Sequence, residues 1–354
     1  MSTFQRDLSL TGQPPKTINL QQKIATVIGI IGLGILALFL MNVSLPHKAI
    51  WLTASLLLMT VGVLLFTRAA YANEHAGIKN HGVYFKSLSS RGFWAWALGI
   101  VLTLFYVVLY WFPQYLGLVT EGDNKGLIAL FDPLSRLISG NPASQWFVYG
   151  TLYTLAILIF GIKFIYKYRH NRYEVIRTFS VMFFQLSFAF LIPEFLVALQ
   201  LPYYDFKNIW PLNYELFAGY KIDEFISAGT IGLLMLIFGV ISVFVITPIL
   251  TYKYGKRWYC SWVCGCGGLA ETSGDSFRHL SDKSLKAWKI ERWLVHSVLV
   301  FSVLMTVAVV HSYLNYDASK YWLNKDAFLI SVAVFLGVLF AVIWYFKRDE
   351  LQKD

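Results

Sequence analysis

The chain has 354 residues, of which 57% are hydrophobic and 14% are charged, and its mean hydropathy is +0.56. This composition is typical of a membrane protein, and it excludes the secreted, fibrous and soluble nucleic-acid-binding classes. The formal net charge is +10, which in a membrane protein first has to be tested as a topology signal. No nucleic-acid partner is therefore expected.

Residues 1–22 are polar, contain Pro14 and Pro15, and predict a mobile cytoplasmic tail. Eight apolar runs of about the 20 residues needed to cross a bilayer follow this tail. They predict an all-α polytopic helix bundle of about eight transmembrane helices, with residues 23–354 forming a single transmembrane domain. The expected spans are 24–43, 49–67, 93–112, 146–166, 177–200, 227–250, 293–312 and 326–346.

Lys and Arg are distributed unevenly over the connections between these spans. The two tails and the connections on their side hold 23 of the 30, and the connections on the other side hold seven. Because positive charge accumulates on the cytoplasmic side, both termini and the loop 251–292 are expected in the cytoplasm. The chain is thus predicted to be a multi-pass protein of the cell inner (cytoplasmic) membrane, surrounded by membrane lipid.

The outer connection 126–139 contains a helix-start signal. Asp132 is a good N-cap and Pro133 fits the first helical position, with apolar residues at helical spacing after them. A short helix that starts here and lies on the outer face is expected.

Glu194 follows Pro193 inside the span 177–200, where a carboxylate is costly. It lies in the outer half of the span, beside a proline kink and an aromatic connection, 201–225. One interpretation makes Glu194 a proton acceptor for a quinol. The other is a protonated Glu194 that binds backbone groups freed by Pro193. The expected distance between Glu194 and the inner face, most of a bilayer, is long for one electron-transfer step.

All three cysteines fall within seven residues, at Cys260, Cys264 and Cys266, just after a span's cytoplasmic end. On a helix, Cys260 and Cys264 would share one face and could bind one metal centre. Gly265, Gly267 and Gly268 would free the backbone so that Cys266 turns toward the same point. Cysteine clusters on the reducing side of a membrane usually bind metal or carry out redox chemistry.

Three thiolates suit iron–sulfur, zinc or cuprous copper, and the spacing decides among them only in part. The paired C-x2-C spacing of a zinc finger and the C-x-x-C-H haem motif are both absent. A cubane cluster normally has four ligands, so one is missing from the cysteine count. Asp275, His279 or another chain is expected to supply it. The alternative is three ordinary interfacial cysteines.

The run from Arg257 to Cys264, RWYCSWVC, follows a membrane span. It resembles the first aromatic C-x3-C signature of the membrane polyferredoxins of the nitrate-reductase quinol dehydrogenase and nitrous-oxide reductase regulator type. The resemblance covers about residues 250–270. It implies a membrane protein that passes electrons, usually from the quinol pool, through 4Fe–4S clusters. Cys260 and Cys264 match the signature, and the flanking Arg257 and Trp262 are expected to tune the cluster or contact its partner.

The sequence departs from this family after Cys264. Gly265 stands where the family has proline, Cys266 is an addition, and no second C-x3-C-P hairpin follows. If two hairpins together hold one cubane, this chain supplies one of them. The other is expected from a second copy of the chain or from a separate polyferredoxin subunit, which places the cluster at a subunit interface.

The leading functional prediction is therefore a membrane electron-transfer subunit that couples the quinol pool to a 4Fe–4S cluster at the cysteine loop. A non-redox proton or ion transporter that uses Glu194 and a cofactor-free anchoring or assembly subunit are the alternatives. Haem is not expected: His296 and His311 lie near the two ends of the seventh span, but each would need an opposing histidine within another span.

Overall fold

The computed structural model describes residues 18–43, 45–72, 92–119, 122–208, 213, 215–255, 257–275, 284–316 and 323–351. Every regular element in these residues is a helix, which confirms the predicted all-α fold. Seven of the helices in the described residues are long and apolar enough to cross a membrane. The remaining predicted span, 93–112, forms the 20-residue helix α4, Gly92–Trp111. The chain is a multi-pass membrane protein.

The described chain forms two compact units. The first comprises residues 1–208 with 244–281, and the second comprises residues 209–243 with 282–354. The prediction of one membrane domain stays a prediction. The second unit contains α9 (Gly219–Ser227), α10 (Gly229–Ile241), α14 (Leu285–Tyr316) and α15 (Lys325–Leu351).

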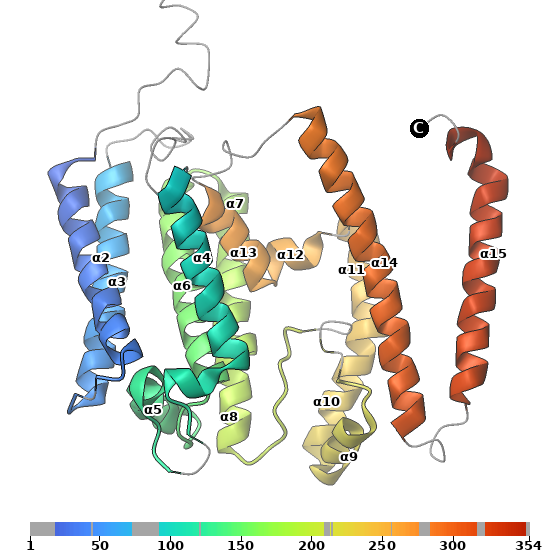
Figure 1. Cartoon of the computed structure of the whole chain (residues 1–354), viewed down its shortest axis with the longest axis horizontal. Helices are drawn as coiled ribbons and strands as arrows, with labels where there is room; N and C mark the ends of the chain where they lie inside the picture. The colour runs from blue at the N-terminus through green and yellow to red at the C-terminus, as the bar shows by residue number, and fades with distance from the viewer. Residues whose placement is uncertain are drawn as a thin grey trace, which may run out of the picture. The chain divides into compact units, whose positions relative to one another are not determined.

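The first unit contains the cysteines (Figure 1). Its α-helices are α2 (Leu20–Leu40), α3 (Lys48–Tyr71), α4, α5 (Gly126–Ile138), α6 (Gln145–Lys167), α7 (Arg172–Phe183), α8 (Ile192–Ala198), α11 (Thr247–Tyr254), α12 (Trp258–Trp262) and α13 (Gly265–Thr272). A short 3-10 helix, η2 (Pro113–Leu116), follows α4.

Helices α2 and α3 pack closely because small residues face each other. A Cβ on Gly62 would lie 2.7 Å from the backbone nitrogen of Gly29, and one on Gly32 would lie 2.8 Å from the Ser55 carbonyl oxygen. The Ser55 hydroxyl donates a hydrogen bond of 2.8 Å to the Gly32 carbonyl. Such small-residue contacts are the usual means of helix association in a bilayer.

The expected short helix in 126–139 is present, but its predicted start is wrong. It starts at Gly126, so Asp132 is not its N-cap. The Asp132 carboxylate instead accepts hydrogen bonds from Asn124 Nδ2 at 2.8 Å and Ala143 N at 2.9 Å. Residues 127–131 are at most 2% exposed while Leu137 is 82% exposed, so one part of the helix packs against the bundle. The predicted place of this helix on the outer face stays a prediction.

Two π-helical segments precede prolines. Segment η3 (Phe184–Leu191) joins α7 to α8 just before Pro193, and η4 (Ser242–Ile246) joins α10 to α11 before Pro248. A proline has no N–H for the helix ladder, and a wider π turn is one way to accommodate that loss. The distortion expected at Pro193 is therefore present, and it takes the form of a π-helical segment.

Candidate metal centre

The three cysteines lie on two short helices. Cys260 is in α12, Cys264 is the N-cap of α13, and Cys266 is in the first turn of α13. The helix breaks between the first two cysteines, since Cys264 has φ −73° and ψ 124°, an extended conformation. The expectation that Cys260 and Cys264 share one helical face is therefore wrong.

The structure brings Cys264 and Cys266 together. The Cys264 and Cys266 thiols lie close enough to shift each other's pKa, and the backbone N–H groups of Cys266 and Gly267 act on the Cys264 thiol. These N–H groups belong to the N-terminus of α13, where the helix dipole favours negative charge. Cys266 therefore lies beside Cys264, and the predicted approach of both thiols to that of Cys260 stays a prediction.

The protonation of this pair is set by neighbouring groups. The hydrogen bond from Cys264 lowers the pKa of the Cys266 thiol to about 5, and the Tyr153 hydroxyl and the charge of Lys207 act in the same direction. The hydrogen bond to Cys266, with burial, raises the pKa of Cys264 above its usual range. The lowered pKa favours the thiolate form of Cys266, which is the form that binds metals.

Tyr153, on α6, contacts the pair directly. Its hydroxyl donates a hydrogen bond of 3.1 Å to Cys266 Sγ. Its ring stacks on Tyr149 with the ring centroids 5.3 Å apart. We did not predict Tyr153 from the sequence; two tyrosines four residues apart in a span, followed by Ile157 and Gly161 at the same spacing, were the available signal.

Cys260 lies beside this pair through its backbone rather than its thiol. A Cβ on Gly267 would lie 2.0 Å from the Cys260 carbonyl oxygen, so α12 and α13 are in tight contact there. Among the described residues, no three His, Cys, Asp or Glu side chains converge on one point where they could bind a single ion. A cubane does not need its thiolates to converge on one point, because each thiolate binds a different iron. Three thiolates from one short segment are the donor type that an iron–sulfur cluster uses.

The three glycines have a different role from the one expected. Gly265, Gly267 and Gly268 all have ordinary helical backbone, and none has a positive φ. Their value is close packing: a Cβ on Gly265 would lie 2.6 Å from Ile157 Cδ1, and one on Gly268 would lie 2.4 Å from Val181 Cγ1. The missing side chains let α13 pack against α6 and α7.

Helix α13 folds back along α6 instead of extending beyond its end (Figure 1). Its first residue, Gly265, contacts Tyr153 and Ile157. Asp275, just after its last turn, contacts Lys167 at the end of α6. Tyr153 precedes Lys167 by 14 residues, which is about 21 Å along a helix. The Cys264–Cys266 pair thus lies at the level of the middle of α6, not beyond its end as expected.

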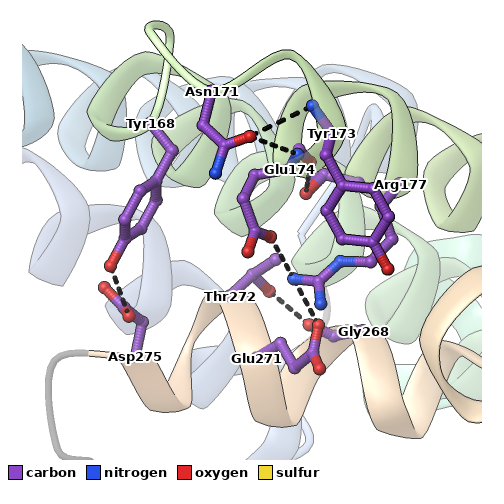
Figure 2. Close-up of polar contacts among 10 residues, drawn as sticks. Tyr168, Asn171, Tyr173, Glu174, Arg177, Gly268, Glu271, Thr272 and Asp275 are labelled. Carbon is purple, nitrogen blue, oxygen red and sulfur yellow. Dashed lines mark hydrogen bonds and ion pairs between the residues drawn. The ribbon is translucent and has the colours of Figure 1, made fainter. Parts of the chain in front are cut away.

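Figure 2 shows the polar contacts that hold the other end of α13. Arg177 on α7 forms ion pairs with Glu174 of the same helix and with Glu271 of α13. The Asp275 carboxylate accepts a hydrogen bond of 2.9 Å from the Tyr168 hydroxyl and pairs with Lys167, and both partners of this pair are 2% exposed. Breaking such a buried pair typically costs about 3–5 kcal/mol, so these contacts fix the C-terminal end of α13.

Asp275 is consequently not the missing fourth ligand. Its carboxylate is occupied by Lys167 and Tyr168. It also lies nine residues after Cys266, about 14 Å along a helix. The other local candidate, His279, lies outside the described residues.

Arg257 and Trp262, the two residues predicted to act beside the cysteines, lie in different surroundings. Arg257 is exposed and is the N-cap residue of α12. The Trp262 carbonyl accepts a hydrogen bond of 2.9 Å from the Ser180 hydroxyl, and its ring packs edge-on against Tyr173. Trp262 therefore attaches the cysteine segment to α7, and a role for either residue in cofactor binding stays a prediction.

A chain of polar contacts lies beside the cysteine segment. Lys207 Nζ donates a hydrogen bond of 3.1 Å to Gln185 Oε1, and Gln185 Nε2 donates one of 3.1 Å to Thr154. The Tyr259 hydroxyl donates one of 3.0 Å to the Lys207 carbonyl. Gln185 belongs to the π segment η3 and lies directly under Gly265. Sequence periodicity did not indicate these residues.

Glu194 is on α8, near Ser139 and Tyr203. It follows Gln185 by nine residues, about 14 Å along a helix. Because Gln185 lies beside the cysteine pair, Glu194 is closer to the cysteines than the breadth of a bilayer. Its function as a proton acceptor stays a prediction. In the second unit, His296 Nδ1 lies 2.7 Å from the Arg292 carbonyl oxygen, and the prediction on haem also stays open.

Residues 232–284 match the family of 4Fe-4S binding domains. No curated protein and no solved structure matches the chain. The matched segment contains all three cysteines and both short helices that position them. Together with the apolar helices, the match supports a membrane iron–sulfur electron-transfer protein with a 4Fe–4S cluster in this segment.

Proposed function

We propose that the chain couples the membrane quinol pool to a 4Fe–4S cluster held by Cys260, Cys264 and Cys266, as a subunit of a larger redox assembly. The observation that carries this proposal is the Cys264–Cys266 pair at the N-terminus of α13, folded back against the middle of α6. A cluster at this level is close to membrane-dissolved carriers, which a cluster beyond the helix ends would not be.

The cluster, when bound, supplies one-electron redox chemistry at a potential that the surrounding protein tunes. Cys264 and Cys266 are its proposed local ligands, with Cys260 as the third. The N-terminus of α13 and the Lys207 ammonium offset the negative charge of the thiolates. A quinol gives up two electrons and two protons on becoming a quinone. The electrons pass singly to an oxidised redox protein of the assembly, and the protons pass to water.

The fourth cluster ligand is proposed to come from outside this chain. Cys260 and Cys266 are exposed, which suits a cluster at an interface, and Asp275 is occupied elsewhere. A second copy of the chain or a separate polyferredoxin subunit would complete the site. The cluster should accordingly be found in an oligomer or a complex and be lost when that assembly is dissociated.

The functional proposal predicts that a quinol reduces the cluster. Adding a short-tailed quinol under anaerobic conditions to the oxidised assembly in nanodiscs should produce the same reduced-cluster EPR signal as dithionite. The matched control is the corresponding dimethoxybenzene, which cannot be oxidised to a quinone by loss of two electrons and two protons. Reduction by dithionite but not by any quinol whose potential is low enough would refute the quinol coupling while leaving the cluster in place.

Tyr153→Phe tests the ligand role of Cys266. A hydrogen bond to a ligand sulfur stabilises the more negative, reduced cluster, so its removal should lower the midpoint potential. A net hydrogen-bond contribution of about 0.5–1.5 kcal/mol corresponds to about 20–60 mV for one electron. Potentiometric EPR titration measures this shift. Tyr149→Phe, whose ring stacks on Tyr153, is the control; equal potentials in wild type and Tyr153→Phe would exclude Cys266 as a ligand.

A further inference from the structure

A cavity of about 420 Å³ lies between α2, α3 and α6 of the first unit. Its wall is mostly apolar and includes Ile30, Leu33, Met59, Val63, Ala156 and Phe160. Ile30 and Leu33 are more than half exposed, so the cavity opens on the surface of the bundle. Its size is in the range of sites that bind small organic molecules.

One amine, that of Lys163, faces this apolar space. Lys163 is only 9% exposed and lines the cavity near the end of α6. Its Nζ lies 5.7 Å from the centroid of the Phe160 ring, so the side chain leans back toward the start of α6. The hydroxyls of Thr26 and Thr67 also line this region but donate to carbonyls of their own helices. Among the described residues that line the cavity, Lys163 is the charged donor.

Helix α6 alone separates this cavity from the cysteine pair. On α6, Tyr153 and Ile157 face α13. The cavity-lining residues Leu155 and Ile159 lie on the opposite face, and Phe160 lies at the boundary between the two faces. A helix with its side chains is about 10–12 Å across, and Tyr153 and Phe160 are about 10 Å apart along the axis. A ring bound near Phe160 would therefore lie within about 15 Å of Cys266, near enough for single-electron transfer without a further cofactor.

We propose that this cavity binds the quinone ring, with Lys163 Nζ donating a hydrogen bond to one quinone carbonyl and the isoprenoid tail leaving past Ile30 and Leu33. The inference rests on the proposed quinol coupling and adds its location. A quinone fits better than a phospholipid, because the space is too small for two acyl chains and the ring is a neutral acceptor of one hydrogen bond. The site is distinct from Glu194, which lies on α8 beside Ser139.

Photolabelling of the assembly in nanodiscs tests this location. The probe is an azido-1,4-benzoquinone with a short isoprenoid tail, and labelled peptides are mapped by mass spectrometry. Label is expected on α2, α3 and α6, and competition by unlabelled quinone gives the affinity. Ala156→Phe fills the cavity from α6 and should reduce labelling at least about tenfold, while Lys163→Met should weaken the affinity about tenfold.

Two further variants make the result decisive. Gly29→Leu fills the cavity from α2, where a Cβ would meet nothing within 4 Å, so it repeats the test without altering α6. Ile162→Phe is the control and should label like wild type, because Ile162 is on α6 and 43% exposed. The cluster EPR signal after dithionite should be unchanged in every variant, which reports intact folding independently of quinone binding.

The outcomes separate the location from the function. If wild type is reduced by quinol but both filled variants still label fully, the cavity is not the site. Loss of label in Glu194→Gln with full label in Ala156→Phe would place the ring at α8 instead. Normal affinity in Lys163→Met would overturn the hydrogen bond. If the azidoquinone does not label the wild-type protein and quinol does not reduce its cluster, the proposed function itself fails.

Discussion

Cys264→Ala protein, purified anaerobically with its partners, is expected to retain less than about a tenth of the wild-type iron and to show no reduced-cluster EPR signal. Cys264 is the centre of the local site, because the Cys266 thiol and two backbone N–H groups of α13 all act on its sulfur. Each cubane iron needs its own ligand.

Iron and acid-labile sulfide assays together with EPR measure this loss. Ser261→Ala is the matched control, since Ser261 lies in the same segment but is not a sulfur ligand. It should keep wild-type iron. Cys264→Ala protein with its full iron content and an unchanged EPR spectrum would show that the cluster is bound elsewhere.

Gly267→Ala is expected to remove most of the cluster without removing a ligand. Its new Cβ would lie 2.0 Å from the Cys260 carbonyl oxygen, a backbone atom that can move only if α12 moves with it. The added methyl group must therefore separate Cys260 from the Cys264–Cys266 pair. We expect less than about a third of wild-type iron, and a loss of roughly 1–3 kcal/mol in the free energy of unfolding from overpacking.

The control for this variant is Gly274→Ala, in the same loop. Among the described residues, a Cβ there would come no nearer than 4.0 Å to another atom, the Leu269 carbonyl oxygen, so this variant should keep both iron and stability. Iron content and thermal unfolding in detergent distinguish the two variants. Equal iron content in Gly267→Ala and Gly274→Ala would mean that close packing of α12 on α13 is not needed to assemble the site.

The membrane architecture was predictable because a bilayer imposes a simple rule on sequence. Runs of about 20 apolar residues predicted each long helix, and the structure has a helix at every one of the eight. The start of α5 was missed because Asp132 and Pro133 form a good helix-start signal locally. Tertiary contacts prevailed there, since the Asp132 carboxylate binds the backbone of Ala143.

The candidate site was predictable in composition but not in geometry. Clustering of the three cysteines indicated a metal centre, and the C-x3-C spacing suggested one helix. Two helices are present instead, since α12 ends at Trp262 and α13 starts at Gly265, with Cys264 between them. Nothing in the local sequence reports that α13 folds back along α6; that depends on Gly265 and Gly268 fitting against residues about 100 positions earlier.

The residues that the sequence did not indicate share one property: each acts through a long-range contact. Tyr153 is separated from Cys266 by 113 positions, and Lys167 from Asp275 by 108. A tyrosine in a span is ordinarily assigned to packing, and a lysine at a span end is ordinarily assigned to topology. Only the placement of α13 gives these two side chains their roles.

The central claim is a 4Fe–4S cluster at the cysteine segment of a membrane protein, and its most direct test is the metal content of the native assembly. The protein should be extracted from its own membranes under anaerobic conditions with whatever subunits accompany it. The predicted result is iron and acid-labile sulfide in equal amounts, with an EPR signal that appears on dithionite reduction. Stoichiometric zinc, or no metal with all three thiols free to alkylation, would contradict the account.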